Sequence, residues 1–406
     1  MYIEGKWIMV NRLFMIIGTG SGQREDFTRE ARDAIARAGL VLSTERLSTN
    51  LAGAAKVRTC PFGKLAENAL SSHAARIAIL VSGDTGFFSA AKSLRQKLTE
   101  HGEVQTICGL TSMQLLCAKL GTPFDDVVWL SLHGRKGSLL GAVSYNRRVF
   151  ALTGGEQNAQ QLCRTLVEAG LGHLRVSRGE NLGASNEQIL TGTAAELAEK
   201  PCGDLAVLLV ENEQPGECCL PVRDSDMERG SVPMTKQEAR WAAVNLLDLR
   251  ASDIVYDIGA GTGSVSMEMA RRVQRGLVYA IERSIDGIAL IDRNRRALGC
   301  WNVLLVEGDA PGAMQGLPVP DAAFIGGSGG TLHETLAILK ERNPKIRIVI
   351  TAVSLETLGD AQQALSDLAF ENITISQLSA VRGHKADSNT PLHANNPIFL
   401  LSGGVR

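Results

Sequence analysis

The sequence predicts an α/β protein with more than one domain. Apolar strand-forming stretches lead into glycine-rich turns and then into helix-forming stretches, and this order recurs in both halves of the chain. A length of 406 residues exceeds what one ordinary hydrophobic core organises. Residues 212–233 are rich in proline, glycine and charge without sustained periodicity, which predicts a linker. We therefore expect one domain over residues 12–211 and a second over residues 234–406.

The most informative stretch is DIGAGTGSVSMEMA, residues 257–270. It continues a predicted strand that begins at Ile254, places glycine at three alternate positions, and passes into a predicted amphipathic helix. Glycine adopts positive φ without strain and lets the backbone approach a ligand closely. The spacing differs from the G-x-G-x-x-G of nicotinamide-binding turns, because Ser264 stands where the last glycine would be.

Two further strand ends complete a predicted cofactor site. A strand over residues 277–281 ends on Glu282, whose carboxylate is placed to bind a ribose diol. A strand over residues 302–306 ends in Glu307-Gly308-Asp309-Ala310, where an adenine would be bracketed. Together the three strand ends resemble the S-adenosylmethionine site of class I methyltransferases, which have a Rossmann-like fold. The resemblance implies that the cofactor is bound by Thr235, Asp257, Gly259, Gly261, Thr262, Gly263, Glu282, Gly308, Asp309 and Ala310. The alternative is a glycine-rich α/β domain that binds no nucleotide.

The regions flanking this site carry further predictions. Thr235 and Glu238 have the spacing of a capping box at the start of a helix. A predicted strand over residues 321–325 ends in a glycine-rich loop that is expected to face the substrate, through Gly327, Ser328, Gly329 and Gly330. Strands are also predicted over residues 347–353, 372–378 and 397–401, which brings the number of strands in the sheet to about seven. The same resemblance implies that the last strand is antiparallel.

The first half has its own series of motifs. A strand over residues 13–17 leads into GTGSG, a strand over residues 77–81 leads into SGDTGFFS, and a third leads into GLTS, whose hydroxyls are expected to cap a helix over residues 113–120. With LHGR, TGGEQNAQQL and ENLG, these motifs resemble the tetrapyrrole methylases of the cobalamin pathway. The resemblance implies two αβα lobes that divide near residues 109–113, with cofactor and substrate in the cleft between them. It assigns cofactor contacts to Gly18, Gly83, Asp84, Gly86, Phe87, Thr111 and Ser112, and it places Arg135 against the substrate. Ser21 and Thr85 depart from the family, which usually has proline at both positions.

The two resemblances together indicate the fused, decarboxylating corrin methyltransferases. They imply methylation of meso carbons 5 and 15 of a tetrapyrrole, with decarboxylation of the ring C acetate, and they assign one methylation to the first module. Holding an activated sulfonium methyl in line with an enamine-like carbon supplies most of the rate acceleration of such a methylation, so no acid–base triad is required. Because the substrate is a polycarboxylate, basic side chains are candidates for binding it. These are Arg135, Lys136, Lys236, Arg382, His384 and Lys385.

Composition excludes several other classes. Lys and Arg total 42 against 43 for Asp and Glu, and aromatic residues are 4%, which disfavours a nucleic-acid-binding protein. The chain contains no apolar run of membrane-spanning length. The eight cysteines lack paired spacing and the seven histidines lack metal-ligand spacing, which predicts reduced thiols and no metal. We therefore expect a cytoplasmic homo-oligomer with a small-molecule tetrapyrrole substrate. Two alternatives remain: a tRNA adenine methyltransferase, which the C-terminal half alone also resembles, or a chain whose first module only binds tetrapyrrole.

Overall fold

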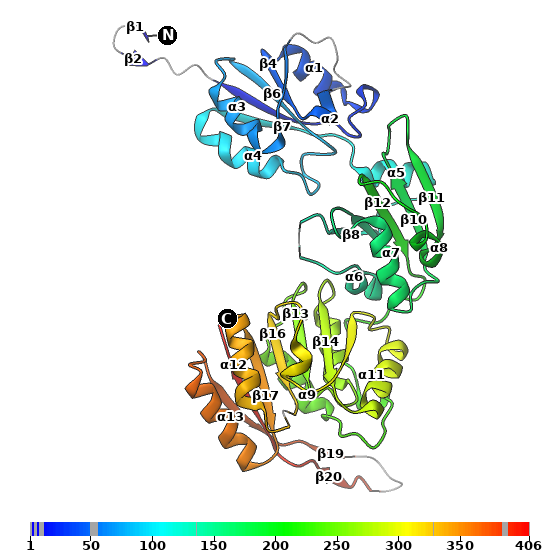
Figure 1. Cartoon of the computed structure of the whole chain (residues 1–406), viewed down its shortest axis with the longest axis vertical. Helices are drawn as coiled ribbons and strands as arrows, with labels where there is room; N and C mark the ends of the chain where they lie inside the picture. Colours follow the sequence, from blue (N-terminus) through cyan, green and yellow to red (C-terminus); the bar gives the residue numbers. More distant parts are fainter. Residues whose placement is uncertain are drawn as a thin grey trace.

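Three sheets follow one another along the long axis of the protein (Figure 1). The computed structural model describes residues 2–3, 6–7, 12–48, 56–134, 136–327, 329–383 and 389–405. Near the amino terminus, β1 (Tyr2–Ile3) and β2 (Lys6–Trp7) form a short antiparallel pair.

The first lobe is a parallel sheet of five strands in the order β5-β4-β6-β3-β7. Residues 14–18 of β3 and 77–81 of β6, the central strands, are apolar and buried, as expected when helices cover both faces of a sheet. The strands are β3 (Leu13–Gly18), β4 (Leu40–Ser43), β5 (Val57–Thr59), β6 (Arg76–Val81) and β7 (Glu103–Ile107). The helices are α1 (Arg29–Arg37), α2 (Glu45–Ser48), α3 (Leu65–Ser71) and α4 (Ala91–Leu98).

The second lobe begins after β7, where the sequence predicts it. Thr111 caps α5, and a reciprocal bond from its backbone N–H to the Gln114 side chain completes a capping box, so the predicted hydroxyl cap is confirmed for Thr111. The sheet has the order β11-β10-β12-β9-β8, and only β8 and β9 are parallel. The strands are β8 (Val128–Ser131), β9 (Arg148–Leu152), β10 (Arg175–Glu180), β11 (Gln188–Thr193) and β12 (Ala206–Glu211). The helices are α5 (Ser112–Leu120), α6 (Leu139–Tyr145), α7 (Ala159–Glu168) and α8 (Ala194–Ala198).

The third sheet has seven strands in the order β15-β14-β13-β16-β17-β21-β18, and β21 is antiparallel to both neighbours. The predicted strand number and the antiparallel last strand are confirmed. The strands are β13 (Ile254–Ile258), β14 (Leu277–Glu282), β15 (Val303–Glu307), β16 (Ala322–Ile325), β17 (Arg347–Ala352), β18 (Thr374–Leu378) and β21 (Ile398–Gly403). The helices are α9 (Gln237–Leu246), α10 (Ser264–Arg272), α11 (Ile285–Ala297), α12 (Leu332–Arg342) and α13 (Leu355–Asp367).

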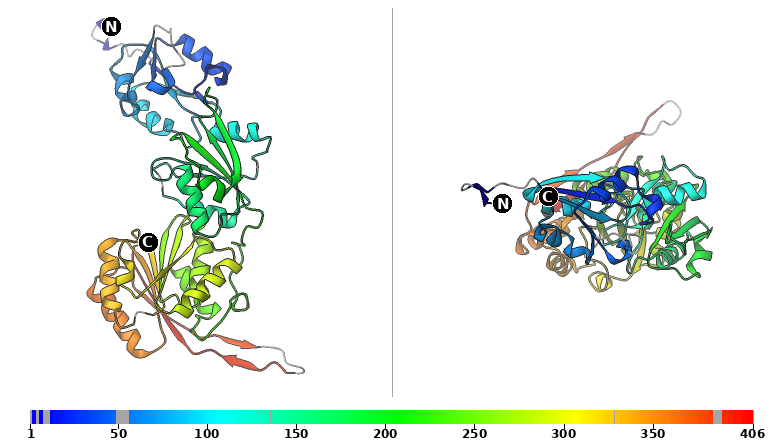
Figure 2. Two further views of the ribbon diagram at one scale, coloured as in Figure 1. Left: turned by 45° about the vertical axis from the view of Figure 1, so that its right-hand side comes forward. Right: turned by 90° about the horizontal axis from the view of Figure 1, so that it is seen from above.

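A hairpin that the sequence does not predict joins β18 to β21. Its strands β19 (Val381–Gly383) and β20 (Leu392–Ala394) pair with each other and extend away from the sheet (Figure 2). Among the described residues neither strand pairs with the seven-stranded sheet. No described ladder hydrogen bond therefore joins the hairpin strands to this sheet.

Residues 212–233, which the composition predicts to be a linker, pack against the C-terminal module. Val222 and Met227 belong to the same apolar core as α9 and α10, and the backbone N–H of Val222 donates to Glu268 on α10 at 2.8 Å. This cover explains why α10 is buried on all sides over residues 264–271, rather than having the solvent-facing side of the predicted amphipathic helix.

The first module docks onto the C-terminal module through α6, whose residues are all buried. A Cβ at Gly141 would lie 2.8 Å from the carbonyl oxygen of Gln274, so only glycine permits this approach. Tyr145 bonds Asn302 at 3.0 Å, and Lys136 pairs with Asp321 at 3.3 Å. These partners precede β14, β15 and β16, so the contact lies at the amino ends of the parallel strands. Lys136, a candidate for binding substrate, therefore lies at the module contact instead.

Candidate functional site

A cavity of about 960 Å³ lies at the carboxyl ends of β13 to β17. Parallel α/β sheets bind ligands at this edge, because the loops that leave the strands converge there. Of the residues predicted from the sequence, those that line the cavity are Thr235, Lys236, Asp257, Gly259, Gly261, Glu282, Gly308, Asp309, Ala310, Gly327 and Gly329. Thr262, Gly263, Gly330 and Arg382 do not line it. Ser328, His384 and Lys385 lie outside the described residues.

The glycines of the turn after β13 are required by close packing. Gly259 has φ 72°, and a Cβ there would lie 2.6 Å from the Gly327 carbonyl oxygen. Gly261 has φ 57°, and its Cβ would lie 3.0 Å from the carbonyl oxygen of Pro233. The loops after β13 and β16 therefore touch through their backbones, and the turn also meets the segment that precedes α9.

Glu282, at the end of β14, holds this turn. One carboxylate oxygen accepts from the backbone N–H of Gly261 at 2.7 Å, and the other accepts from Ser284 at 2.8 Å. The side chain lines the cavity yet the residue is only 8% exposed. A carboxylate oxygen can accept more than one hydrogen bond, so Glu282 can still accept from a ligand hydroxyl.

Asp257 is the most deeply buried acid at the cavity. Ser266 donates to one of its carboxylate oxygens, and the other has no partner among the described residues. Burial raises the pKa of Asp257 from its ordinary value of 3.8 to about 7. The hydroxyl of Thr262, which does not line the cavity, is likewise buried and has no partner in the described part of the chain. Unpartnered buried polar atoms at a cavity are typical of a site that a ligand completes.

Helix α9 begins differently from the prediction. It starts at Gln237 without a side-chain cap, so the predicted capping box of Thr235 and Glu238 is wrong. The Glu238 carboxylate instead binds Arg382 of β19, at 2.8 and 2.5 Å, and this bond lowers the pKa of Glu238. The Thr235 carbonyl accepts from Arg240 at 2.9 Å. An ion pair with a distant arginine therefore replaces the local cap.

A second cavity, of about 540 Å³, lies between the two lobes of the first module. It is lined by Gly83, Asp84 and Phe87 of the first lobe and by Thr111 and Ser112 of the second. The motifs that are expected to line a cleft between two lobes therefore lie together at such a cleft. Arg135 lies outside the described residues.

Two residues predicted at this second site, Gly18 and Gly86, do not line it. A Cβ at Gly18 would lie 2.7 Å from the Gly83 carbonyl oxygen and 2.8 Å from the Gly109 nitrogen. Gly86, which also does not line the cavity, donates to Asp84 at 2.7 Å, and the other oxygen of Asp84 accepts from Gly109 at 3.0 Å. Asp84 therefore fastens the loops to each other.

Ser21, one of the two departures from the family, makes a local turn through its side chain. Its hydroxyl donates to Asp26 at 2.5 Å and accepts from the Gln23 N–H at 3.1 Å. These bonds restrain the loop in which the family usually has proline. No described contact gives Thr85 a comparable part.

Sequence reasoning missed several residues of both cavities. Phe62, Phe88 and His133 line the cavity between the lobes. Phe88 and His133 lie in the motifs SGDTGFFS and LHGR, which could have indicated them, whereas Phe62 lies in no such motif. In the C-terminal module, residues 231–233 and Asn395 line the first cavity. They come from the predicted linker and from the segment after β20, neither of which has a recognisable motif.

Among the described residues, no helix has the length and apolar character needed to cross a membrane. All eight cysteines are free thiols.

Comparisons with known proteins match a different family to each half of the chain. The model of a precorrin methyltransferase domain matches residues 228–401, and that of the tetrapyrrole (corrin/porphyrin) methylases matches residues 13–198. A probable cobalt-precorrin-6B C(15)-methyltransferase (decarboxylating) of Methanothermobacter thermautotrophicus is 41% identical over 186 residues, which cover 45% of this chain and 95% of that protein. The precorrin-6Y C(5,15)-methyltransferase (decarboxylating) of a Sinorhizobium species is 28% identical over 360 residues, 86% of each chain. A solved precorrin-6Y C5,15-methyltransferase from Geobacter metallireducens is 31% identical, covers 46% of this chain and 97% of its own, and has a TM-score of 0.44.

Proposed function

Since this chain belongs to the decarboxylating precorrin methyltransferase family, we propose that it methylates a precorrin-6Y-type tetrapyrrole at meso carbons 5 and 15 and decarboxylates its ring C acetate. The observation that carries the proposal is the presence of two ligand-sized cavities on two different α/β folds. One S-adenosylmethionine delivers one methyl group. Two methylations on one chain are therefore best served by two cofactor sites.

The C-terminal cavity fits S-adenosylmethionine. Glu282 would accept from the ribose hydroxyls, Gly308 to Ala310 would bracket the adenine, and the turn at Gly259 and Gly261 leaves room for a close backbone approach. The unpartnered oxygen of Asp257 supports the fit, since it leaves an acceptor for a ligand at the end of β13. When bound, S-adenosylmethionine supplies a methyl group that its positive sulfonium already activates.

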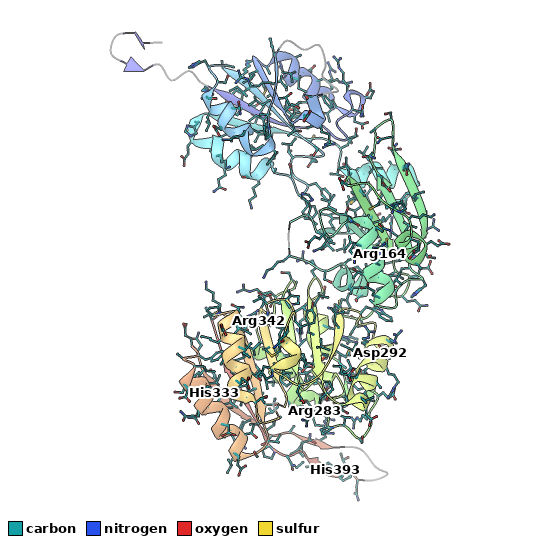
Figure 3. All side chains as sticks on the ribbon, in the orientation of Figure 1. Arg164, Arg283, Asp292, His333, Arg342 and His393 are labelled. Carbon is teal, nitrogen blue, oxygen red and sulfur yellow. The ribbon has the colours of Figure 1, made fainter. Side chains whose placement is uncertain are left out.

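The chain contributes position and charge rather than an acid–base pair. Lys236 and Arg283 line the C-terminal cavity and are both exposed, so they are suited to bind carboxylates of a tetrapyrrole. Figure 3 labels Arg283. The glycine-rich loop at Gly327 and Gly329 lines the same cavity and leaves space for a large, flat substrate. Holding substrate and methyl donor in line lowers the barrier by removing the entropy of encounter.

The first module is proposed to bind the second S-adenosylmethionine between its lobes. Its cavity combines backbone-rich loops at Gly83 and Thr111 with the ring of Phe87, which packs edge to face against Trp129 at 5.4 Å between centroids. Trp129 is 49% exposed. An exposed aromatic surface beside the cavity suits a planar macrocycle.

The proposal is tested by mass spectrometry of the product formed from precorrin-6Y and S-adenosylmethionine. We expect a gain of two methyl groups and the loss of one carbon dioxide. A gain of one methyl group alone would leave the first module as a tetrapyrrole-binding unit. Methylation of tRNA with no change in precorrin-6Y would contradict the proposal, and the formal net charge of −1 argues against that outcome.

The proposal includes a cytoplasmic location, which the eight free cysteines favour. It also includes a homo-oligomeric state, which light scattering of the purified chain would measure.

A further inference from the structure

We propose that Arg382 is a positioning residue of the C-terminal cavity. By pairing with Glu238, it fastens the β19–β20 hairpin to α9 and so fixes the spacing between two walls of the cavity. The inference rests on the proposed function in one respect, namely that S-adenosylmethionine is the ligand of this cavity.

The two walls belong to segments far apart in the sequence. The first, which we call the strap, is residues 231–236, and it passes over the turn at Gly261. The second, which we call the hairpin base, consists of Leu378, Ala380, Ala394, Asn395 and Asn396. Leu378 is the last residue of β18 and pairs with Ile398 of the main sheet, whereas β19 and β20 pair only with each other in the described part of the chain. Beyond Leu378, ladder hydrogen bonds to the main sheet therefore do not fix where the hairpin lies relative to the strap.

Arg382 provides the link on the hairpin side. Its Nε donates to one oxygen of Glu238 at 2.8 Å, and its Nη2 donates to the other at 2.5 Å. The same Nη2 lies 2.9 Å from a carboxylate oxygen of Asp224. The Arg382 side chain is 25% exposed and that of Glu238 is 28% exposed, so water screens the pair less than it screens a surface pair. A two-point bond of this kind fixes orientation as well as distance.

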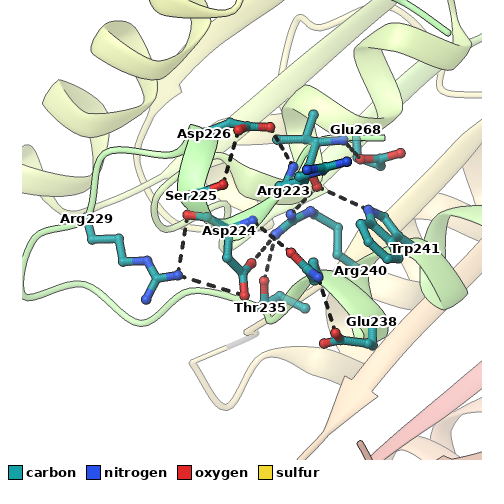
Figure 4. A network of polar contacts seen from close by, with 12 residues as sticks. Arg223, Asp224, Ser225, Asp226, Arg229, Thr235, Glu238, Arg240, Trp241 and Glu268 are labelled. Atoms are coloured by element: carbon teal, nitrogen blue, oxygen red, sulfur yellow. Dashed lines mark hydrogen bonds and ion pairs between the residues drawn. The ribbon is translucent and has the colours of Figure 1, made fainter. Parts of the chain in front are cut away.

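Asp224 carries the link onward to the strap (Figure 4). Its residue is 5% exposed, and its second oxygen lies 3.3 Å from Nη1 of Arg240, which is fully buried. Arg240 donates to the carbonyl of Thr235, a strap residue, at 2.9 Å and to that of Val222 at 2.6 Å. A continuous series of charged contacts therefore runs from β19 to the strap.

These contacts distinguish positioning from substrate binding. The sequence places Arg382 among the groups that bind a substrate carboxylate, but its guanidinium already binds two carboxylates of the protein and does not line the cavity. Without the Arg382 cation between them, the carboxylates of Glu238 and Asp224 would repel each other. The hairpin base would then separate from the strap, which widens the cavity.

Calorimetry measures S-adenosylmethionine binding to the full chain. The C-terminal site is identified as the binding event that is lost in Gly261→Arg. We expect Arg382→Gln to raise the Kd and the KM for S-adenosylmethionine about fivefold or more, with kcat changed less than twofold. Arg382→Lys keeps the charge but loses the two-point bond, so it should recover part of the affinity. Arg293→Gln is the matched control, because it breaks a 2.8 Å ion pair between α11 and Glu228 without touching the hairpin.

A double-mutant cycle separates the pair from two independent effects. If Arg382 acts through Glu238, the chain with Arg382→Gln and Glu238→Gln together should bind S-adenosylmethionine no more weakly than Arg382→Gln alone. Thermal unfolding confirms that each variant folds, and Arg382→Lys decides the question should Arg382→Gln not fold.

Three results would overturn the proposal. They are unchanged cofactor affinity in Arg382→Gln, additive effects in the cycle, and a raised KM for the tetrapyrrole alone, which would make Arg382 a substrate-binding residue. A wild-type chain that binds no S-adenosylmethionine would instead refute the proposed function.

Discussion

The carboxylate of Glu282 accepts a hydrogen bond from the backbone N–H of Gly261 at 2.7 Å, so the end of β14 holds the turn that follows β13. Substitution of Glu282 by Ala therefore removes both a ligand acceptor and a restraint on the turn. We expect it to weaken S-adenosylmethionine binding by about 1–3 kcal/mol, the usual cost of removing a charged hydrogen-bond partner. Calorimetry measures the change, with the exposed Glu334→Ala on α12 as control. Equal affinity of Glu282→Ala and wild type would exclude Glu282 from the cofactor site.

The raised pKa of Asp257 predicts how stability depends on pH. Burial raises this pKa to about 7, so between about pH 4 and pH 7 the folded state retains a proton that the unfolded state has lost. The contribution of Asp257 to the free energy of unfolding should therefore fall as pH rises through this range and level off above about pH 7. Asp257→Asn should remove that part, because the amide does not titrate.

Urea unfolding of both chains at several pH values between 5 and 8 checks this prediction. We expect the difference in unfolding free energy between Asp257→Asn and wild type to move in favour of the variant as pH rises. A difference independent of pH would show that Asp257 ionises at its ordinary pKa.

Cleavage of the chain between the exposed residues Glu213 and Gln214 should yield two folded modules that remain associated. Each module has its own sheets and cores, and Val222 stays with the C-terminal core. The contact at α6 should hold the fragments together, as judged by co-elution in size-exclusion chromatography. Gly141→Leu should release them, because its side chain would enter the backbone of Gln274 and Gly276. Fragments that aggregate alone and fold only when mixed would contradict the division into two domains.

Blocking each cavity in turn should separate the two methylations. Gly261→Arg forces a side chain against Pro233 at φ 57°, and we expect it to abolish the carbon 15 methylation and the loss of carbon dioxide while a singly methylated product still forms. Gly83→Arg fills the cavity between the lobes, where a Cβ meets no atom within 4 Å, and it should spare decarboxylation. Mass spectrometry distinguishes the products. Release of carbon dioxide at the normal rate by Gly261→Arg would move decarboxylation to the first module.

Local patterns in the sequence were sufficient to predict most strands and the residues at the strand ends that line the C-terminal cavity. The alternation of apolar strands with glycine turns places Gly259, Glu282 and Gly308 at neighbouring strand ends, because parallel strands bring their carboxyl ends to one edge. The same reasoning failed for Glu238. Its spacing from Thr235 satisfies a local capping rule, but its partner Arg382 is 144 residues away. The β19–β20 hairpin was missed for a similar reason, since side chains of other segments hold it rather than its own pattern.

The docking of the first module at the amino ends of the C-terminal strands has a consequence for how the two reactions are connected. The C-terminal cavity opens at the other end of β14, six residues and roughly 20 Å away. The cavity between the lobes likewise lies beyond the carboxyl end of β9, whereas α6 docks near its amino end. Within one chain, an intermediate must therefore leave one cavity and diffuse through solvent to the other. Fusion keeps the two modules at equal concentration. An intermediate that has left its cavity can be captured by any copy of the enzyme, and the rate of that capture falls when the enzyme is diluted.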